Sequence, residues 1–182
     1  MRHPLVLQVA AISLCLLSFE TALGLSLELV DKLDIKAIKS INLTKTNEEY
    51  SATVVVQFSS TAEIALKFRN PRFAITFEDG KGTEIYLGTT EQNILFPASE
   101  DGTEKLVDKE LAVFVGKNDV NTTTRLVDLF NLIGNPDSDF SMKLSGKTNV
   151  GTKAKRGWVY HGEVEIEDFI FHPTIQREVL FK

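Results

Sequence analysis

The residues that could do chemistry are few in this sequence, and the densest group is His161, Glu163 and Glu165. These three alternate along one predicted strand, so their side chains would project from one face, about 7 Å apart. An imidazole with two carboxylates could bind a divalent cation if further ligands came from elsewhere. Surface strands commonly carry such residues, and a single histidine is a weak ligand set, so we predict no metal site.

A fragment of a phosphate-binding loop is present at Gly146-Lys147-Thr148. The complete motif needs a glycine five residues before Gly146, where Ser141 stands, and a helix after the threonine whose amides hold phosphate. The residues that follow, 150–157, are instead typical of a hairpin loop. We therefore predict no nucleotide site.

Nucleophilic catalysis has no clear set of residues. The one cysteine, Cys15, lies in an apolar N-terminal run, and Ser59-Ser60-Thr61 lacks the glycines of a nucleophile elbow. Acidic residues are numerous, but no pair stands out as a general acid and base. We expect a protein that is not an enzyme and uses no cofactor.

A basic stretch runs from Lys143 to Arg156, with five basic residues and no acidic one. It could contact anionic lipid, an anionic polymer or nucleic acid. The nearest aromatic residues, Trp158 and Tyr160, are in phase with Val164, which points them inward. The charge would be balanced by acidic residues on the next strand (Glu163, Glu165, Glu167 and Asp168). We interpret the stretch as a solvated loop and expect no nucleic-acid partner, in keeping with a net charge of −5.

The composition is that of one ordinary globular domain. The chain has 182 residues, of which 43% are hydrophobic and 25% charged, and it contains one cysteine. These values exclude collagen, low-complexity disorder, a multi-pass membrane protein, a disulfide framework and a cysteine-rich zinc module. A chain of this length buries about 70% of its unfolded surface, which is enough for a single core.

The first 24 residues have the features of a signal peptide. Arg2 supplies a positive charge, residues 5–19 form an apolar run, and Ala22-Leu23-Gly24 is a site that a signal peptidase could cleave. The run is short for a membrane span, which needs about 20 apolar residues. We predict cleavage after Gly24, leaving one domain of residues 25–182, and export to the periplasm or the extracellular space. An uncleaved segment that tethers the domain to a membrane is the alternative.

The dominant pattern in the remaining chain is an alternation of apolar and polar residues, which is typical of strands with one buried face. Turn residues separate these runs. The spacing predicts a mainly β fold, an antiparallel β-sandwich of the fibronectin or immunoglobulin type. Strands are expected at residues 35–43, 53–58, 62–69, 73–77, 84–87, 93–96, 111–115, 140–145 and 158–167.

Two changes of phase interrupt the alternation. The inward-facing positions are even-numbered up to Phe68 and odd-numbered from Phe73, with Asn70-Pro71 between them. Because proline cannot donate a ladder hydrogen bond, we expect Pro71 to end a strand and Asn70 to favour a turn, with the chain changing face or sheet there. A second change predicts a β-bulge around Glu167-Asp168.

One segment has helical periodicity. Candidate N-caps at residues 121–123, a C-cap at Gly134 and a stop at Pro136 predict a short helix at about residues 123–133. Its apolar residues follow the spacing i, i+3, i+4 and i+7 (Leu126, Leu129, Phe130 and Ile133).

The order of these features resembles the group 2 late embryogenesis abundant family, also called the water stress and hypersensitive response domain. The resemblance rests on an alternating strand that ends at Asn70-Pro71, on Leu87-Gly88 and on the placement of one helix, and it covers residues 35–171. Members usually have Asn-Pro-Asn, whereas this chain has Arg72 at the third position. The resemblance implies a small antiparallel β-sandwich with one helix, a role in desiccation and other stresses, and no enzymatic activity.

We therefore predict an exported, non-catalytic β-sandwich that protects the cell envelope under stress through weak contacts with envelope proteins or lipid headgroups. The alternative is a lipid- or peptide-binding module of the envelope. Its cavity between the sheets would be lined by five phenylalanines (Phe68, Phe73, Phe77, Phe96 and Phe140). A solid core is the simpler interpretation, because a sandwich of this size needs such residues to fill the layer between its sheets.

Overall fold

The computed structural model describes residues 27–135 and 137–171, with the backbone alone for residues 167–171. The predicted signal peptide, residues 1–24, and the tail from residue 172 lie outside the described residues. The elements, in chain order, are β1 (Leu33–Lys45), β2 (Glu49–Ser60), β3 (Leu66–Asp79), β4 (Glu84–Thr90), β5 (Ile94–Phe96), β6 (Lys105–Lys117), α2 (Val120–Gly134), β7 (Phe140–Ala154) and β8 (Gly157–Phe171).

Most of the strands lie where the alternating pattern predicts them. The strand expected at residues 62–69 begins only at Leu66, because β2 and β3 belong to different parts of the sheet and residues 61–65 connect them. Ile64, which the alternation places inside, is 44% exposed on this connection. The basic stretch is not a loop either, because β7 extends to Ala154 and the turn is confined to Lys155-Arg156.

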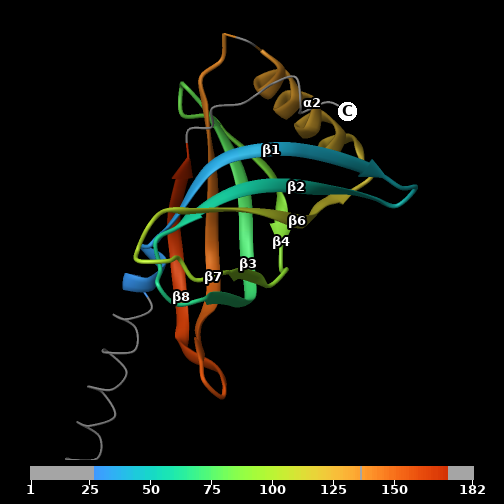
Figure 1. The fold of residues 1–182 in the computed structure, drawn as a ribbon. Helices are drawn as coiled ribbons and strands as arrows, with labels where there is room; N and C mark the ends of the chain where they lie inside the picture. The colour runs from blue at the N-terminus through green and yellow to red at the C-terminus, as the bar shows by residue number, and fades with distance from the viewer. Residues whose placement is uncertain (1–26, 136, 172–182) are drawn as a thin grey trace, which may run out of the picture.

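The strands form one curled antiparallel sheet. Its order is β1-β2-β6-β4-β3-β7-β8, and β5 pairs with β3. In Figure 1, β1, β2 and β6 cross over β3, β7 and β8, and the core lies between these two groups. The mainly antiparallel β fold is confirmed. The two separate sheets of a sandwich are not found, because Thr89 of β4 pairs with Phe114 of β6 and joins the two groups.

Aromatic rings link the two groups of strands across the core. Phe58 of β2 contacts Phe96 of β5 edge to face, with ring centroids 5.3 Å apart, and Phe96 contacts Phe68 of β3 at 5.1 Å. All three rings are buried. The five phenylalanines of the proposed cavity are buried as well, and each contacts another phenylalanine ring (Phe68, Phe73, Phe77, Phe96 and Phe140).

Asn70-Pro71 does not end a strand. β3 runs through both residues, and its pairing with β7 shifts between Arg69 and Arg72, so the two form a β-bulge. Asn70 has a left-handed backbone, with φ 49°, and its N–H donates to Asn93 Oδ1 at 2.7 Å. Pro71 has no N–H to satisfy and is buried. The predicted change of phase is present, because the buried positions of β3 are even-numbered before the bulge and odd-numbered after it. The strand stays in the same sheet, and Arg69 and Arg72 both lie on its outer face.

The bulge predicted near the C-terminal end of the domain is confirmed. Leu144 of β7 pairs with Phe169, and Gly146 pairs with Ile166. One residue of β7 therefore lies opposite Glu167 and Asp168 of β8, as a β-bulge requires.

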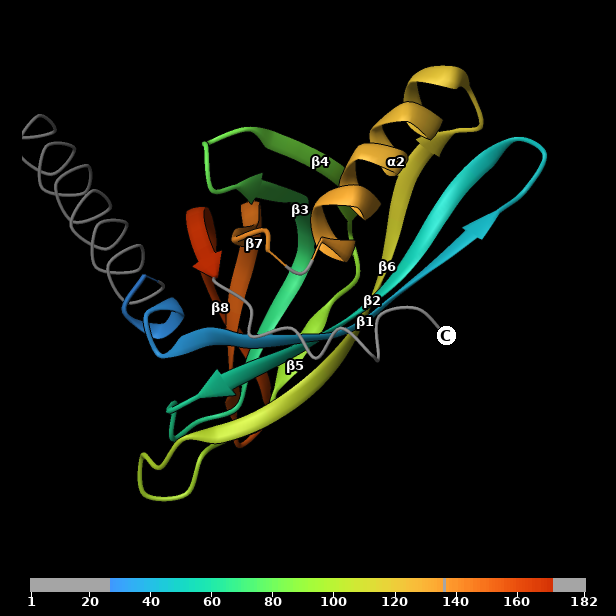
Figure 2. The ribbon, with the colours of Figure 1, turned by 90° about the horizontal axis from the view of Figure 1, so that it is seen from above.

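Helix α2 starts three residues earlier than its periodicity predicts. The N-cap is Asp119, whose Oδ1 accepts a hydrogen bond from the N–H of Thr122 at 2.8 Å, and the C-cap is Asn135 in place of Gly134. This hydrogen bond is the main reason that the pKa of Asp119 lies below its usual range. Figure 2 shows α2 lying along β4 and β6, where Arg125 donates to the carbonyl of Val115 at 2.7 Å.

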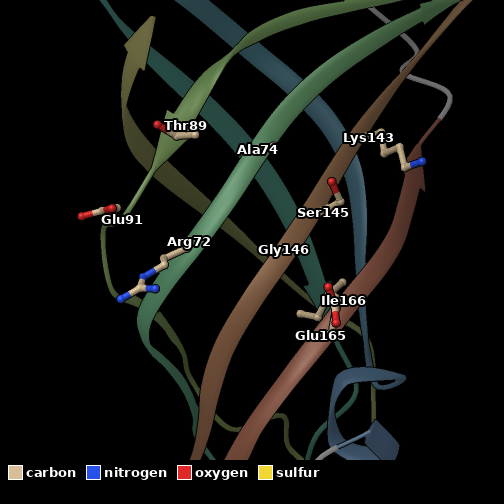
Figure 3. A pocket seen from close by; sticks show the side chains of 9 residues that line it. All are labelled: Arg72, Ala74, Thr89, Glu91, Lys143, Ser145, Gly146, Glu165 and Ile166. Atoms are coloured by element: carbon tan, nitrogen blue, oxygen red, sulfur yellow. The ribbon is translucent and has the colours of Figure 1, made fainter.

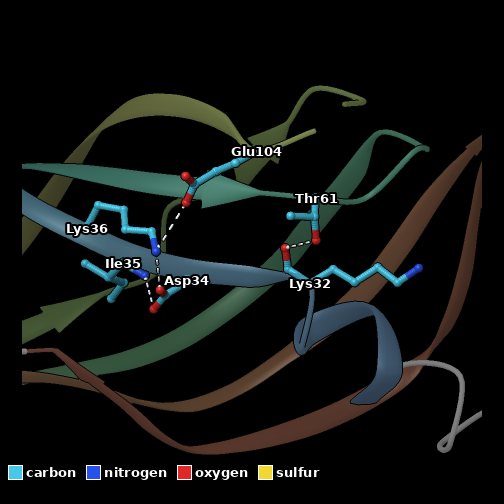
Figure 4. A network of polar contacts seen from close by, with 6 residues as sticks. All are labelled: Lys32, Asp34, Ile35, Lys36, Thr61 and Glu104. Carbon is cyan, nitrogen blue, oxygen red and sulfur yellow. Dashed lines mark hydrogen bonds and ion pairs between the residues drawn. The ribbon is translucent and has the colours of Figure 1, made fainter. Parts of the chain in front are cut away.

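A polar network at the start of β1 joins it to the segment that precedes β6. Lys36 Nζ lies 2.8 Å from a carboxylate oxygen of Asp34 and 3.2 Å from one of Glu104 (Figure 4). The hydrogen bonds to Asp34 and Glu104 raise the pKa of Lys36. In the same region Thr61 donates to the carbonyl of Lys32. These groups are exposed, so the ion pairs contribute little to stability.

Candidate functional site

Strand β8 carries a bulge that the sequence pattern does not predict. Tyr160 pairs with Gly151 and Glu163 pairs with Asn149, so two residues of β8 lie opposite one residue of β7. Gly162 is one of the two, and its φ of 114° is a backbone conformation that glycine adopts readily. A bulge of this kind reverses which face of the sheet is occupied by the side chains before and after it.

Trp158 and Tyr160 consequently lie on the outer face of the sheet. They pair with Lys153 and Gly151, which are outer-face positions of β7, whereas Val164 beyond the bulge is buried in the core. The prediction that both rings point inward is therefore wrong, because the extra residue breaks the phase between Tyr160 and Val164. The rings lie instead among the basic residues of β3 and β7.

Three cations lie over these two rings. Lys67 Nζ is 5.9 Å and Lys153 Nζ is 5.5 Å from the centroid of Trp158, and Arg69 Cζ is 4.9 Å from the centroid of Tyr160. Distances within about 6 Å are those of cation–π contacts. We refer to these five residues as the cationic–aromatic surface.

Gly151 allows the ring of Tyr160 to lie across strand β7. A Cβ atom at Gly151 would be 2.8 Å from Tyr160 Cε1 and 2.9 Å from Cδ1, closer than carbon atoms approach. With glycine there, the ring reaches over β7 from β8 toward Arg69 on β3. The surface is therefore formed by three strands, and the closest approach of the Tyr160 ring to strand β7 is at Gly151.

The cations of this surface have no acidic partner in the part of the chain that the structure describes. Within residues 27–135 and 137–171, Lys67, Arg69 and Lys153 form no ion pair with a carboxylate. Farther along the same outer face Lys147 Nζ does have one, 3.5 Å from Glu165. The surface therefore presents positive charge, although the whole chain is acidic.

The positive charge continues at the β7–β8 turn. Lys155 and Arg156 are exposed there, and neither forms an ion pair within the described part of the chain. Together with the three cations beside the rings, they place five positive charges at one end of the sheet. This local excess attracts anions at short range, whatever the sign of the total charge.

A hollow of about 430 Å³ lies on the same outer face, beyond the bulge at Asn70-Pro71 (Figure 3). Its charged lining residues have both signs (Arg72, Glu91, Lys143 and Glu165), and its hydroxyls belong to Thr89 and Ser145. No histidine or cysteine lines it. The hollow thus offers no hydroxyl beside an imidazole base.

The structure separates the residues of the metal hypothesis. The bulge lies between His161 and Glu163, and His161 Nε2 is hydrogen-bonded to Thr152 Oγ1 at 2.8 Å. Glu165 is paired with Lys147. Among the described residues, no group of three or more histidine, cysteine, aspartate or glutamate side chains is placed to hold a metal ion.

The phosphate-loop fragment lies inside a strand. Gly146-Lys147-Thr148 belongs to β7, and Thr148 is buried with its hydroxyl directed at the carbonyl of Arg69, 3.4 Å away. A strand, rather than a helix with free N-terminal amides, follows the threonine. The fragment therefore has no phosphate-binding geometry.

Two hollows bear on the lipid- or peptide-binding alternative. The hollow of Figure 3 and a second one of about 590 Å³, which lies where β2 and β6 meet β4, both lie on the outer face. Neither is lined by any of the five phenylalanines of the proposed cavity.

None of the helices within residues 27–135 and 137–171 has the length and apolar character of a membrane span.

Comparisons with known proteins leave the family of this chain open. No protein-family model matches the sequence, and no curated protein matches it. A crystal structure of a protein from Archaeoglobus fulgidus aligns with a TM-score of 0.31 and 8% identity, over 78% of this chain and 99% of that one. The solution structure of a protein from Arabidopsis thaliana aligns with a TM-score of 0.30 and 16% identity, over 78% and 83%. Alignments at these TM-scores support no inference about function.

Proposed function

We propose that the protein is a non-catalytic binding domain that holds anionic components of the cell envelope on its cationic–aromatic surface. The observation that carries this proposal is the convergence of three cations on two rings, without an acidic partner in the described chain. The ammonium groups of Lys67 and Lys153 share one indole and repel each other. An anion bound between them would relieve that repulsion.

This proposal is compatible with the resemblance to group 2 late embryogenesis abundant proteins, which implies protection under stress without catalysis. The proposal also depends on the predicted export of the chain, because an exported domain would contact components of the envelope. Each basic residue near an anionic surface contributes about 1 kcal/mol, so the three cations of the surface and the two of the adjacent turn together contribute about 5 kcal/mol. That energy corresponds to a dissociation constant of roughly 0.2 mM. The contact would be weak and reversible.

Retention on a phosphate-bearing cation-exchange matrix tests the proposal. The triple variant K67Q/R69Q/K153Q removes the three cations of the surface, and K39Q/K81Q/K117Q removes three exposed lysines elsewhere, so both variants have the same net charge. We expect the first variant to elute at much lower salt than the second. Equal elution of the two variants would show that total charge, and not this surface, determines binding.

Protection during drying tests the physiological part of the proposal. A test enzyme is dried together with anionic membrane vesicles and with the wild-type protein, one of the two triple variants, or no added protein. Its residual activity is measured after rehydration. We expect wild-type protein and K39Q/K81Q/K117Q to preserve more activity than K67Q/R69Q/K153Q. Protection that is the same for all three proteins would separate stress tolerance from the cationic–aromatic surface.

A further inference from the structure

We infer that the anionic partner of the cationic–aromatic surface is a phospholipid bilayer rich in anionic headgroups, which the β7–β8 hairpin contacts with its tip. This inference rests on the proposed function and names the partner of the same site. Three features of the described residues support it: the position of the charges, the placement of the rings and the extent of the surface.

The charges lie on a part of the molecule that a flat surface can reach. Figure 1 shows β7 and β8 continuing below the other strands as a projecting hairpin. Lys155 and Arg156 occupy its turn and are exposed, and Lys153 lies next to the turn. A bilayer can therefore touch the turn and the side of the hairpin that carries the cations.

The aromatic residues of the hairpin have the amphipathic character of interfacial anchors. Trp158 and Tyr160 are half-buried on the outer face, and between them Val159 is 49% exposed on the other face of the strand. Tryptophan and tyrosine are favoured at the headgroup level of membranes, where an apolar ring body and a polar edge are both accommodated. Lysine and arginine side chains beside them reach the phosphates.

The same rings disfavour single-stranded nucleic acid as the partner. Proteins of that class use open ring faces on which bases stack. Here Lys67 and Lys153 lie over Trp158, and Arg69 lies over Tyr160, which itself rests on Gly151. A base could stack only by displacing the cations that would attract its phosphates.

The cationic region is also short. From Arg156 in the turn to the acidic residue Glu163 on β8 it spans seven residues, roughly 23 Å at 3.3 Å per residue. A long polyanion that followed the strands would next meet Glu163 and Glu165, both of which are exposed. A bilayer meets the end of the hairpin alone, so the short region suits it better.

Trp158 provides a direct readout, because it is the only tryptophan in the chain. Full-length protein is titrated with vesicles made of equal parts phosphatidylglycerol and phosphatidylcholine, and with vesicles of phosphatidylcholine alone. We expect a blue shift of the tryptophan emission with the anionic vesicles, reversed by high salt, and none with the neutral ones. A shift that is equal for both vesicles would contradict the inference.

Two matched variants assign the effect to the hairpin turn. K155Q/R156Q removes both turn charges, and at about fivefold per charge it should weaken partitioning into anionic vesicles about 30-fold. K81Q/K117Q removes two exposed lysines elsewhere and should leave partitioning within about twofold of wild type. Every protein carries the same apolar residues 1–24, so a contribution from them cancels in the comparison. Equal partitioning of the two variants would overturn the inference.

Two soluble polyanions separate failure of this inference from failure of the proposed function. The same emission is followed with polyphosphate and with oligothymidylate. A response to polyphosphate without a response to anionic vesicles would leave anion binding standing and reject the bilayer. Tighter binding of oligothymidylate than of anionic vesicles would reject the bilayer in favour of nucleic acid. No response to vesicles or to either polyanion would reject both the inference and the proposed function.

Discussion

Replacement of Gly151 by alanine tests whether the Tyr160 ring lies across strand β7, on which the cationic–aromatic surface depends. The new Cβ would be 2.8 Å from Tyr160 Cε1. Carbon atoms in contact are about 3.5–4.0 Å apart, so the ring has to move by roughly 0.7 Å or more. The movement would alter the contact of the ring with Arg69, whose Cζ is 4.9 Å from the ring centroid.

The size of the effect follows from two opposing contributions. Overpacking costs about 1–3 kcal/mol, and we take about 1.5 because the ring of Tyr160 is only half-buried and can yield. Alanine is favoured over glycine within a strand by about 0.5 kcal/mol, because glycine loses more conformational freedom on folding. The expected net destabilisation is therefore about 1 kcal/mol. With a urea m-value of about 2 kcal/mol/M, the midpoint should fall by about 0.5 M.

The decisive comparison is made in a Tyr160→Ala background by urea unfolding at one pH and salt concentration. There the alanine at position 151 has no ring to meet, so the midpoint should rise by about 0.25 M instead of falling. The coupling energy between the two positions is then about 1.5 kcal/mol, within the range found for residues in contact. A coupling near zero would show that the Tyr160 ring does not lie over Gly151 and would refute this description of the surface.

Three further predictions concern the fold that supports the site. Asp119→Ala should lower the urea midpoint by removing the cap on Thr122, and Asp119→Asn should lower it less. The folded pKa of Asp119 is depressed, so the contribution of its charge is complete above the ordinary pKa of 3.8 and is lost as the pH falls from there through the lower folded pKa; wild type and Asp119→Asn should therefore converge in acid. Phe96→Ala should destabilise the protein by about 3–5 kcal/mol in urea unfolding, because it empties a fully buried ring site between the two groups of strands, and a loss below about 1 kcal/mol would mean that the core is not packed as described. Gly88→Ala would place a Cβ 2.2 Å from the backbone oxygen of Phe114, which cannot rotate away as a side chain does. We expect the free energy of unfolding to fall by roughly 1–3 kcal/mol and amide hydrogen exchange at Phe114 to become faster. Unchanged exchange would argue against the β4–β6 junction.

Much of the secondary structure is predictable from this sequence because its signals are local. Alternation over a few residues places most of the strands, and the spacing from Leu126 to Ile133 identifies the helix. The ends of the helix are less predictable. Any of several polar residues could cap it, and the position of Asp119 as the cap depends on where β6 ends before the helix.

The number of sheets is not a local property. The change of phase at Asn70-Pro71 is visible in the sequence, but it is compatible with a strand break or with a bulge. The bulge is selected by the partner strand, since a Cβ at Gly146 would lie 2.0 Å from the carbonyl oxygen of Arg72, and only glycine permits the approach. That pairing joins residues far apart in the chain, so periodicity does not report it.

The candidate site depends even more on tertiary structure. The amino-acid sequence by itself determines the strands, the helix, the acidic total charge and the basic stretch from Lys143 to Arg156. Gly162 in the middle of a strand is the one local sign of the bulge that turns Trp158 outward. The meeting of Lys67 with Trp158 and Lys153 is decided by the register between β3, β7 and β8, because strand pairing brings together charges that no local pattern connects.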